Sequence, residues 1–109
     1  MIFVVGGAYQ GKKEYALKEF GKEYKIVNDY HLKVRNQLKE EKNIFEEAEK
    51  ILSENDNIVI ISNELGCGIV PVDPFEREYR EQNGRINCFL AKRADKVIRV
   101  ICGVGVRIK

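Results

Sequence analysis

A glycine-rich segment directly behind the first apolar run has the residue types and spacing of a phosphate-binding loop. Gly6, Gly11 and Lys12 fit the pattern G-x-x-x-x-G-K-[ST], in which main-chain N–H groups cradle phosphates and the lysine adds a full positive charge. Lys13 stands where a serine or threonine hydroxyl normally binds Mg²⁺, and an ammonium group has no lone pair for a metal ion. The predicted phosphate-binding residues are Gly6, Gly7, Ala8, Tyr9, Gln10, Gly11, Lys12 and Lys13.

The change at Lys13 leaves several outcomes open. Mg²⁺ can be held by a carboxylate and waters alone, the extra ammonium can replace part of its charge, or binding can persist without catalysis. A glycine-rich turn that binds nothing is the alternative reading of the whole loop. The position of the loop, between an apolar segment and a helical pattern, favours phosphate binding because a helix N-terminus carries free N–H donors and partial positive charge.

Glu64 is the second candidate for chemistry. It follows the most continuous apolar segment, residues 58–61, together with Asn63. Ligands of α/β proteins bind at the carboxyl ends of strands, so Glu64 is a candidate to organise a metal ion, water or a proton, and Asn63 is a candidate polar contact. The alternative is that both residues only close the turn.

The elements that must position these residues alternate between strand and helix patterns. Short apolar runs predict strands at residues 2–5, 24–27, 58–61, 97–102 and 104–108, and helical spacing predicts helices at 12–20, 30–38, 44–52 and 74–94. Gly21 ends the first helix, Asn28-Asp29 caps the second, and Asp73-Pro74 begins the last. This order predicts a single compact α/β domain over residues 1–109, with a mostly parallel sheet and helices on both faces.

Composition excludes several classes of protein. The chain has 109 residues with a net charge of +2, and its charges are interleaved, which disfavours nucleic-acid binding. Its apolar runs are too short to span a membrane. Its three cysteines form no metal-binding or disulfide pattern, which favours small, partly buried thiols in a reducing compartment. We expect a cytoplasmic protein.

The C-terminal half resembles a known family. Residues 62–71 read S-N-E-L-G-C-G-I-V-P, and further matches lie at Tyr79, Arg80, Glu81, Gly84, Arg85, Asn87, Leu90, Ala91, Ala94, Asp95, Val97, Gly103, Ile108 and Lys109. This pattern, with the opening Gly-Gly-Ala and Gly-Lys of the loop, is similar to adenosylcobinamide kinase/adenosylcobinamide-phosphate guanylyltransferase, a bifunctional P-loop enzyme of cobalamin assembly. The resemblance covers residues 1–16 and 58–109.

The resemblance implies a P-loop NTPase-like α/β fold, ATP or GTP as cofactor, and phosphoryl transfer to a corrinoid hydroxyl. It also implies GMP transfer through a guanylylated histidine, and a homo-oligomer, with a trimer as the expected state. His31 and Arg35 repeat the H-x-x-x-R spacing of that histidine, and imidazole can form a phosphoramidate. The alternative is a helical histidine that pairs with nearby acids.

The sequence departs from the family in its middle. The family has a longer middle with a D-C-L-T-L-W strand that supplies a metal-binding aspartate, and no such segment is found between Glu23 and Asn57. Glu64 is then the only acid expected at a comparable strand end. Gly105 also replaces a usual proline.

Three functions follow from these features. The first is a reduced cobinamide kinase/guanylyltransferase relative in which Lys12, Glu64 and His31 carry the chemistry, with Mg²⁺ as a further cofactor but no predicted protein metal site. The second is a noncatalytic nucleotide- or corrinoid-binding module. The third is a protein-interaction domain in which the loop no longer binds nucleotide.

Overall fold

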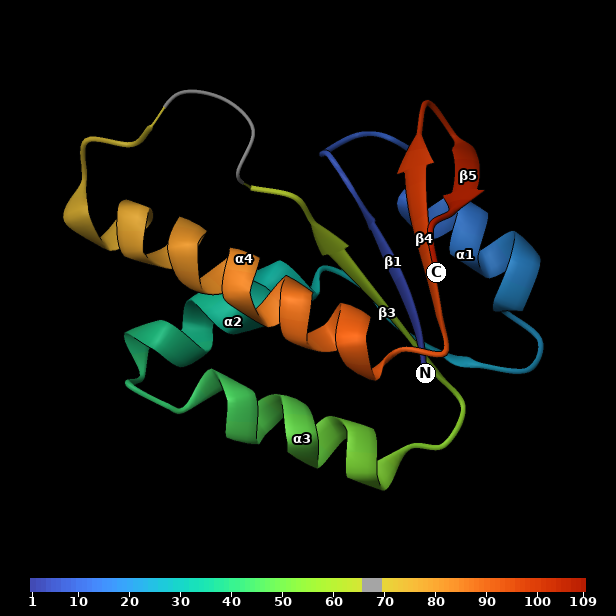
Figure 1. Ribbon diagram of the computed structural model, residues 1–109, viewed down its shortest axis with the longest axis horizontal. Coiled ribbons are helices and arrows are strands. Elements are labelled where there is room, and N and C mark those ends of the chain that lie inside the picture. The colour runs from blue at the N-terminus through green and yellow to red at the C-terminus, as the bar shows by residue number, and fades with distance from the viewer. Residues whose placement is uncertain (66–69) are drawn as a thin grey trace.

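The computed structural model describes residues 1–65 and 70–109, which form an α/β structure around one sheet (Figure 1). Its strands are β1 (Ile2–Gly6), β2 (Lys25–Val27), β3 (Ile58–Asn63), β4 (Lys96–Ile101) and β5 (Val104–Arg107). Its helices are α1 (Lys12–Phe20), α2 (Tyr30–Lys39), α3 (Ile44–Glu54) and α4 (Pro74–Arg93). The predicted order of strands and helices is confirmed, with ends that differ by one or two residues.

The strands lie in the order β2-β3-β1-β4-β5. Neighbouring strands are parallel from β2 to β4, and only β5 is antiparallel to its neighbour. The mostly parallel sheet is therefore confirmed. Because β1 and β3 lie side by side, with β2 beyond β3, the loops that follow these three strands meet at one edge of the sheet.

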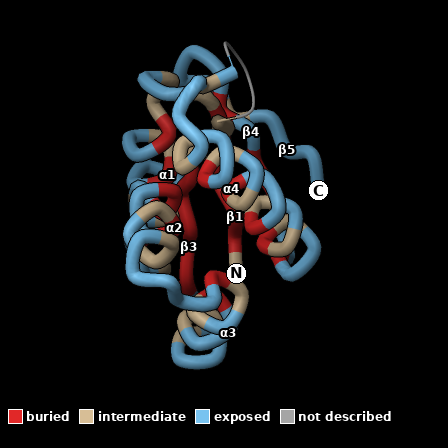
Figure 2. Tube along the Cα trace, turned by 90° about the vertical axis from the view of Figure 1, so that its left-hand side faces the viewer, coloured by how far each residue is buried: buried red, intermediate tan, exposed pale blue. Residues whose placement is uncertain are grey.

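Both faces of the sheet are covered, as predicted. Alternate residues of the central strands point to opposite sides, so a continuous apolar run is needed to fill both. Phe3, Val5 and Ile60 pack under α2, α3 and α4, whereas Val4 and Ile61 pack on the side of α1. The buried stretches of β1 and β3 run through the middle of the molecule in Figure 2. This packing fixes the strand ends that carry the candidate site.

Two predicted helix ends are confirmed. Gly21 ends α1 with its N–H bonded to the carbonyl of Leu17. Asp73 caps α4, because its side chain accepts hydrogen bonds from the N–H groups of Phe75 and Glu76, and Pro74 occupies the first turn.

The predicted cap of α2 is wrong. Asp29 does precede α2, but its backbone is left-handed, with φ of 53°, and its side chain makes no capping hydrogen bond. A capping residue normally has extended dihedrals that aim its side chain at the first turn. Because Asp29 has a left-handed backbone, its carboxylate does not bind the first turn of α2.

Three smaller findings complete the fold. Cys88 and Cys102 are free and exposed rather than partly buried, whereas Cys67 and the rest of the segment 66–69 lie outside the described residues. Among residues 1–65 and 70–109, no helix is long and apolar enough to cross a membrane. The turn between β4 and β5 has two left-handed residues, Cys102 and Gly103.

Candidate functional site

The glycine-rich loop joins β1 to α1 as the sequence predicts, and it requires its glycines. A Cβ atom at Gly6 would lie 2.5 Å from the carbonyl oxygen of Val100, so only glycine lets β1 pass β4 this closely. Gly11 has φ of 82° and begins α1 without a side-chain cap. Ala8 and Tyr9 form a tight turn, and Gly11 precedes the first turn of α1, whose own N–H groups have no intrahelical partner. These N–H groups and the uncapped helix end remain available to an anion.

The loop is held from behind by the β4–β5 turn. The carbonyl of Gln10 accepts a hydrogen bond of 2.7 Å from the N–H of Gly103, and its side-chain Oε1 accepts one of 2.7 Å from the N–H of Cys102. Both bonds use acceptors of the loop and leave its donors unused. The C-terminal hairpin therefore fixes the loop in an open conformation.

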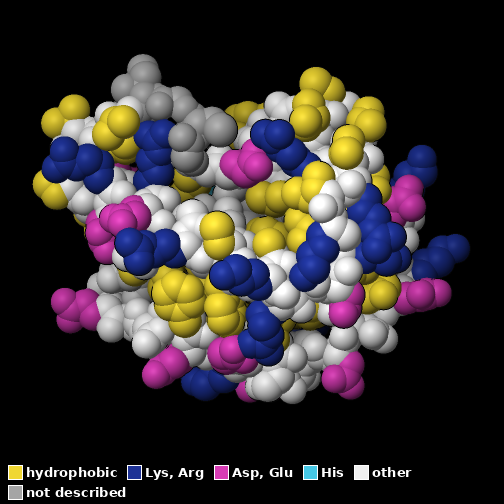
Figure 3. Space-filling model, in the orientation of Figure 1, with side chains coloured by type: hydrophobic (Ala, Val, Ile, Leu, Met, Phe, Trp, Pro, Cys, Tyr) yellow, Lys and Arg dark blue, Asp and Glu magenta, His cyan; other side chains and the backbone are white. Residues whose placement is uncertain are grey.

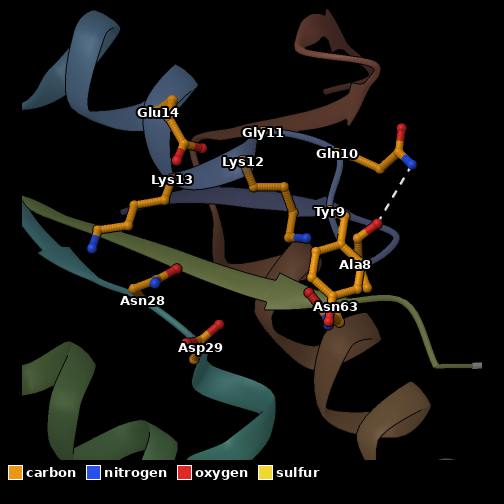
Figure 4. A pocket seen from close by; sticks show the side chains of 10 residues that line it. All are labelled: Ala8, Tyr9, Gln10, Gly11, Lys12, Lys13, Glu14, Asn28, Asp29 and Asn63. Carbon is orange, nitrogen blue, oxygen red and sulfur yellow. Dashed lines mark hydrogen bonds between the residues drawn. The ribbon is translucent and has the colours of Figure 1, made fainter.

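A cavity of about 300 Å³ lies in front of the loop (Figure 4). It is lined by the loop, by the first turn of α1, and by residues at the ends of β2 and β3: Ala8, Tyr9, Gln10, Gly11, Lys12, Lys13, Glu14, Asn28, Asp29 and Asn63. The structure thus brings most of the predicted phosphate-binding residues around one space.

Lys12 points back along the loop rather than into bulk solvent. Its side chain is 8% exposed, and Nζ donates a hydrogen bond of 2.5 Å to the carbonyl oxygen of Gly7. Burial lowers the pKa of Lys12, against the opposing effect of the carboxylates of Asp29, Glu64 and Glu14. An ammonium that is desolvated in this way binds an incoming phosphate more strongly than one at the surface, because the local dielectric is lower.

Asp29 is the residue that sequence reasoning missed. It lies across the cavity from Lys12 and Lys13, together with Asn28 (Figure 4). The expectation that Glu64 is the only acid at a comparable strand end is therefore wrong, because Asp29 lies two residues after β2 at the same edge of the sheet. The signal available in the sequence was its position behind an apolar strand, which was interpreted as a helix cap.

Lys13 and Tyr9 lie at the rim of the cavity. Lys13 is exposed and lines the same space as Lys12, so the loop presents two ammonium groups. Tyr9 has a left-handed backbone with φ of 58°, and its side chain is fully exposed.

Glu64 lies beside the cavity rather than in its lining. One carboxylate oxygen is 3.1 Å from Nη2 of Arg99 on β4, and the main-chain N–H of Glu64 donates to the carbonyl of Gly6. The carboxylate is within electrostatic range of Lys12, whose pKa it raises. In this structure Glu64 thus joins the ends of β1, β3 and β4.

His31 lies behind the cavity, in the first turn of α2. It is buried, and its Nδ1 accepts a hydrogen bond of 3.2 Å from the main-chain N–H of Asn63. Its carbonyl accepts a hydrogen bond of 2.8 Å from the hydroxyl of Tyr79. Burial lowers the pKa of His31; Asp29 opposes this shift and Lys12 adds to it. The structure therefore favours a neutral imidazole with its proton on Nε2.

No group of three or more histidine, cysteine, aspartate or glutamate side chains that could hold a metal ion occurs among the residues that the structure describes. A cation at this site would need ligands from phosphates and water in addition to Asp29. Mg²⁺ is commonly bound in this way, through one or two carboxylates plus substrate phosphates.

Comparison with known proteins identifies a matching family and several relatives. A family model described as cobinamide kinase / cobinamide phosphate guanyltransferase matches residues 25–108. The bifunctional adenosylcobalamin biosynthesis protein CobU of Salmonella typhimurium is 46% identical over 52 residues, which cover 48% of this chain and 29% of that protein. CobU of Escherichia coli is 44% identical over 52 residues, which again cover 48% of this chain and 29% of that protein. CobP of Pseudomonas aeruginosa is 31% identical over 52 residues, 30% of its length. Each alignment thus spans less than a third of the relative.

Proposed function

This chain belongs to the cobinamide kinase / cobinamide phosphate guanyltransferase family, and on that basis we propose that it binds ATP or GTP at residues 6–13 and transfers phosphate to a corrinoid. The observation that carries the proposal is the cavity in which Lys12 and free loop amides face the carboxylate of Asp29. The family match begins at residue 25, so the support for the loop itself comes from its geometry.

The charges around the cavity support a nucleotide with a cation. The loop side presents Lys12, Lys13 and the N-terminus of α1, which favour phosphate oxygens. The carboxylate of Asp29 on the other side would repel a bare phosphate. Asp29 is the residue that would hold a Mg²⁺ ion here, and such an ion would supply positive charge that offsets this repulsion.

Catalysis at such a site consists mainly of positioning. In the reaction that we propose, a corrinoid hydroxyl oxygen bonds to the γ-phosphorus, and the bond from that phosphorus to the β–γ bridging oxygen breaks. The hydroxyl proton passes to solvent, and ADP or GDP leaves with the bridging oxygen and its electron pair. Lys12 and the loop amides would stabilise the oxygens that gain charge. Glu64, through its contact with Arg99, would hold the strand ends in register around this space.

The direct test is turnover with Mg²⁺-ATP or Mg²⁺-GTP and cobinamide, followed by chromatography of the corrinoid. We expect phosphorylated corrinoid from the wild-type chain and a loss of at least about 100-fold in rate for Asp29→Asn. The matched control is Asp56→Asn, at an exposed aspartate in the turn before β3, which should react as the wild type does. Equal rates for the two variants would contradict the role of Asp29.

A noncatalytic nucleotide- or corrinoid-binding module is the second candidate, favoured by Lys13 in place of the usual hydroxyl. Such a module binds nucleotide with little dependence on Mg²⁺ and produces no phosphorylated corrinoid. Turnover therefore discriminates the two cases, and Lys13→Ser is a further test of the loop. A gain in the dependence of nucleotide binding on Mg²⁺ would support a decayed active site, whereas no change would indicate that the loop has been repurposed.

Self-association is part of the proposal. Exposed apolar side chains gather on the β4–β5 hairpin, where Figure 3 shows a hydrophobic area, and they include Ile101, Val104, Val106 and Ile108. Covering this area in a homo-oligomer, with a trimer as the expected state, would remove apolar surface from water. Sedimentation equilibrium measures the mass, and Val106→Glu should shift it toward the monomer.

A further inference from the structure

The main chain of Asn63 is held by three side chains from two helices. His31 of α2 accepts the N–H of Asn63 through Nδ1, at 3.2 Å. Asn83 and Asn87 of α4 donate to the carbonyl of Asn63 through Nδ2, at 3.1 and 3.3 Å. Asn63 is the last residue of β3, and it lines the cavity (Figure 4). Asn63 also pairs with Gly6 of β1 in the sheet, so its backbone is held by a strand on one side and by two helices on the other.

The arrangement is costly, which indicates a specific role. Asn83 is fully buried, and its Oδ1 has no hydrogen-bond partner among the described residues; the same is true of the buried Oδ1 of Asn87. An apolar residue at either position would avoid this cost. The two side-chain amides instead donate a pair of hydrogen bonds to the carbonyl of Asn63.

We propose that His31, Asn83 and Asn87 are positioning residues, which act together to hold Asn63 at the wall of the nucleotide cavity. The inference rests on the proposed function for its ligand. It assigns His31 a role other than that of a nucleophile. With Nδ1 occupied by the N–H of Asn63 and Nε2 protonated, neither nitrogen offers a free lone pair to a phosphorus atom.

The first test is the tautomer of His31, which does not depend on nucleotide binding. His31 is the only histidine of the chain, so a long-range ¹H–¹⁵N spectrum contains a single imidazole. We expect a neutral ring at pH 7.5 with the proton on Nε2. A proton on Nδ1 would contradict the proposal even if nucleotides bind well.

The second test compares two substitutions of His31 by the affinity for ATP and GTP. Asparagine places an acceptor near the position of Nδ1, whereas leucine removes it. We expect His31→Asn to stay within about threefold of the wild type and His31→Leu to lose about tenfold, the usual effect of one hydrogen bond in a protein interior. Equal affinities of the two variants, measured at a temperature at which both are folded, would contradict the role of the His31 hydrogen bond in holding Asn63.

A third variant tests the hydrogen bonds that α4 donates to the carbonyl of Asn63. Asn83→Leu removes a donor to the Asn63 carbonyl and should weaken nucleotide binding by about tenfold. Gln82→Ala, at the neighbouring position, is the control, because the side chain of Gln82 donates a hydrogen bond to Glu78 of the same helix rather than to Asn63. Mass spectrometry after incubation with GTP completes the set: a GMP adduct on His31 would refute its assignment as a positioning residue. If the wild-type chain binds no nucleotide at all, the proposed function is wrong. The tautomer of His31 still tests whether its Nδ1 accepts the N–H of Asn63.

Discussion

At the scale of single residues, Lys12 carries most of the predicted affinity for phosphate. It is buried, it lies over the loop, and its pKa is lowered chiefly by loss of solvent. Lys12→Ala should weaken ATP binding by about 10- to 100-fold, the range expected for a charge-assisted hydrogen bond. Lys18→Ala is the control, because Lys18 is an exposed lysine of the same helix that does not line the cavity. Equal losses for both would mean that only net charge matters.

His31 predicts a specific dependence of stability on pH. Burial lowers its pKa from the ordinary value of 6.5, so the unfolded chain binds the proton more readily than the folded chain. The stabilisation from neutral His31 is complete above pH 6.5 and decreases as the pH falls below it, by at most about 1.4 kcal/mol per pH unit.

Urea unfolding at pH 5.5 and 7.5 measures this effect. The wild type should lose more free energy of unfolding between the two pH values than His31→Asn, which has no titrating group at this position. Identical losses would show that His31 does not retain a lowered pKa in the folded chain.

The sequence singles out Lys12 as a candidate but not Asp29, and both line the cavity. The loop has a regular spacing that identifies its lysine without any tertiary information. Asp29 follows a strand of only three residues, and an acid before a helix has a simpler interpretation as a cap. Only the strand order, with β2 beyond β3 at the same edge, shows that Asp29 faces the loop.

At the scale of elements, the site depends on the contact between α1 and the β4–β5 hairpin. A Cβ atom at Gly105 would lie 2.2 Å from the ring of Tyr15, so no larger residue fits there unless the ring moves. These ring atoms are the outer end of the Tyr15 side chain, so Gly105→Ala can be accommodated by a movement of the ring and should destabilise the fold by about 1 kcal/mol.

Gly84 offers the opposite case within α4. A Cβ atom there meets no atom within 4 Å, so Gly84→Ala should stabilise the helix by about 0.5–1 kcal/mol. Thermal unfolding of the two variants tests both predictions: the Tm should rise for Gly84→Ala and fall for Gly105→Ala. A stabilising Gly105→Ala would contradict the close packing of α1 on the hairpin.

The helices and strands themselves were largely predictable. Continuous β-branched runs in β1 and β3, the Asp73-Pro74 start of α4, and Gly21 after α1 are local signals, and each has its expected structure. The three side-chain hydrogen bonds to Asn63 were not predictable. Their partners lie 20 to 32 positions away in the sequence, and the same residue types also occur on ordinary helix surfaces.

At the scale of the whole molecule, the sheet places a cationic loop and an acid at one edge, and the helices on both faces hold that edge together. The alternation of strand and helix patterns predicted this architecture, since parallel strands require crossovers that cover both faces. The surface that would join copies of the chain lies on the C-terminal hairpin, next to the loop it supports.

The most direct measurement is isothermal titration of the wild-type chain with ATP, GTP and GMP, each with and without Mg²⁺. We expect micromolar or tighter binding of ATP or GTP, weaker binding of GMP because it lacks the β- and γ-phosphates, and a gain in affinity with Mg²⁺ that Asp29→Asn removes. Binding no stronger than millimolar for all three nucleotides would contradict this expectation, since the loop amides and Lys12 would then form no phosphate site.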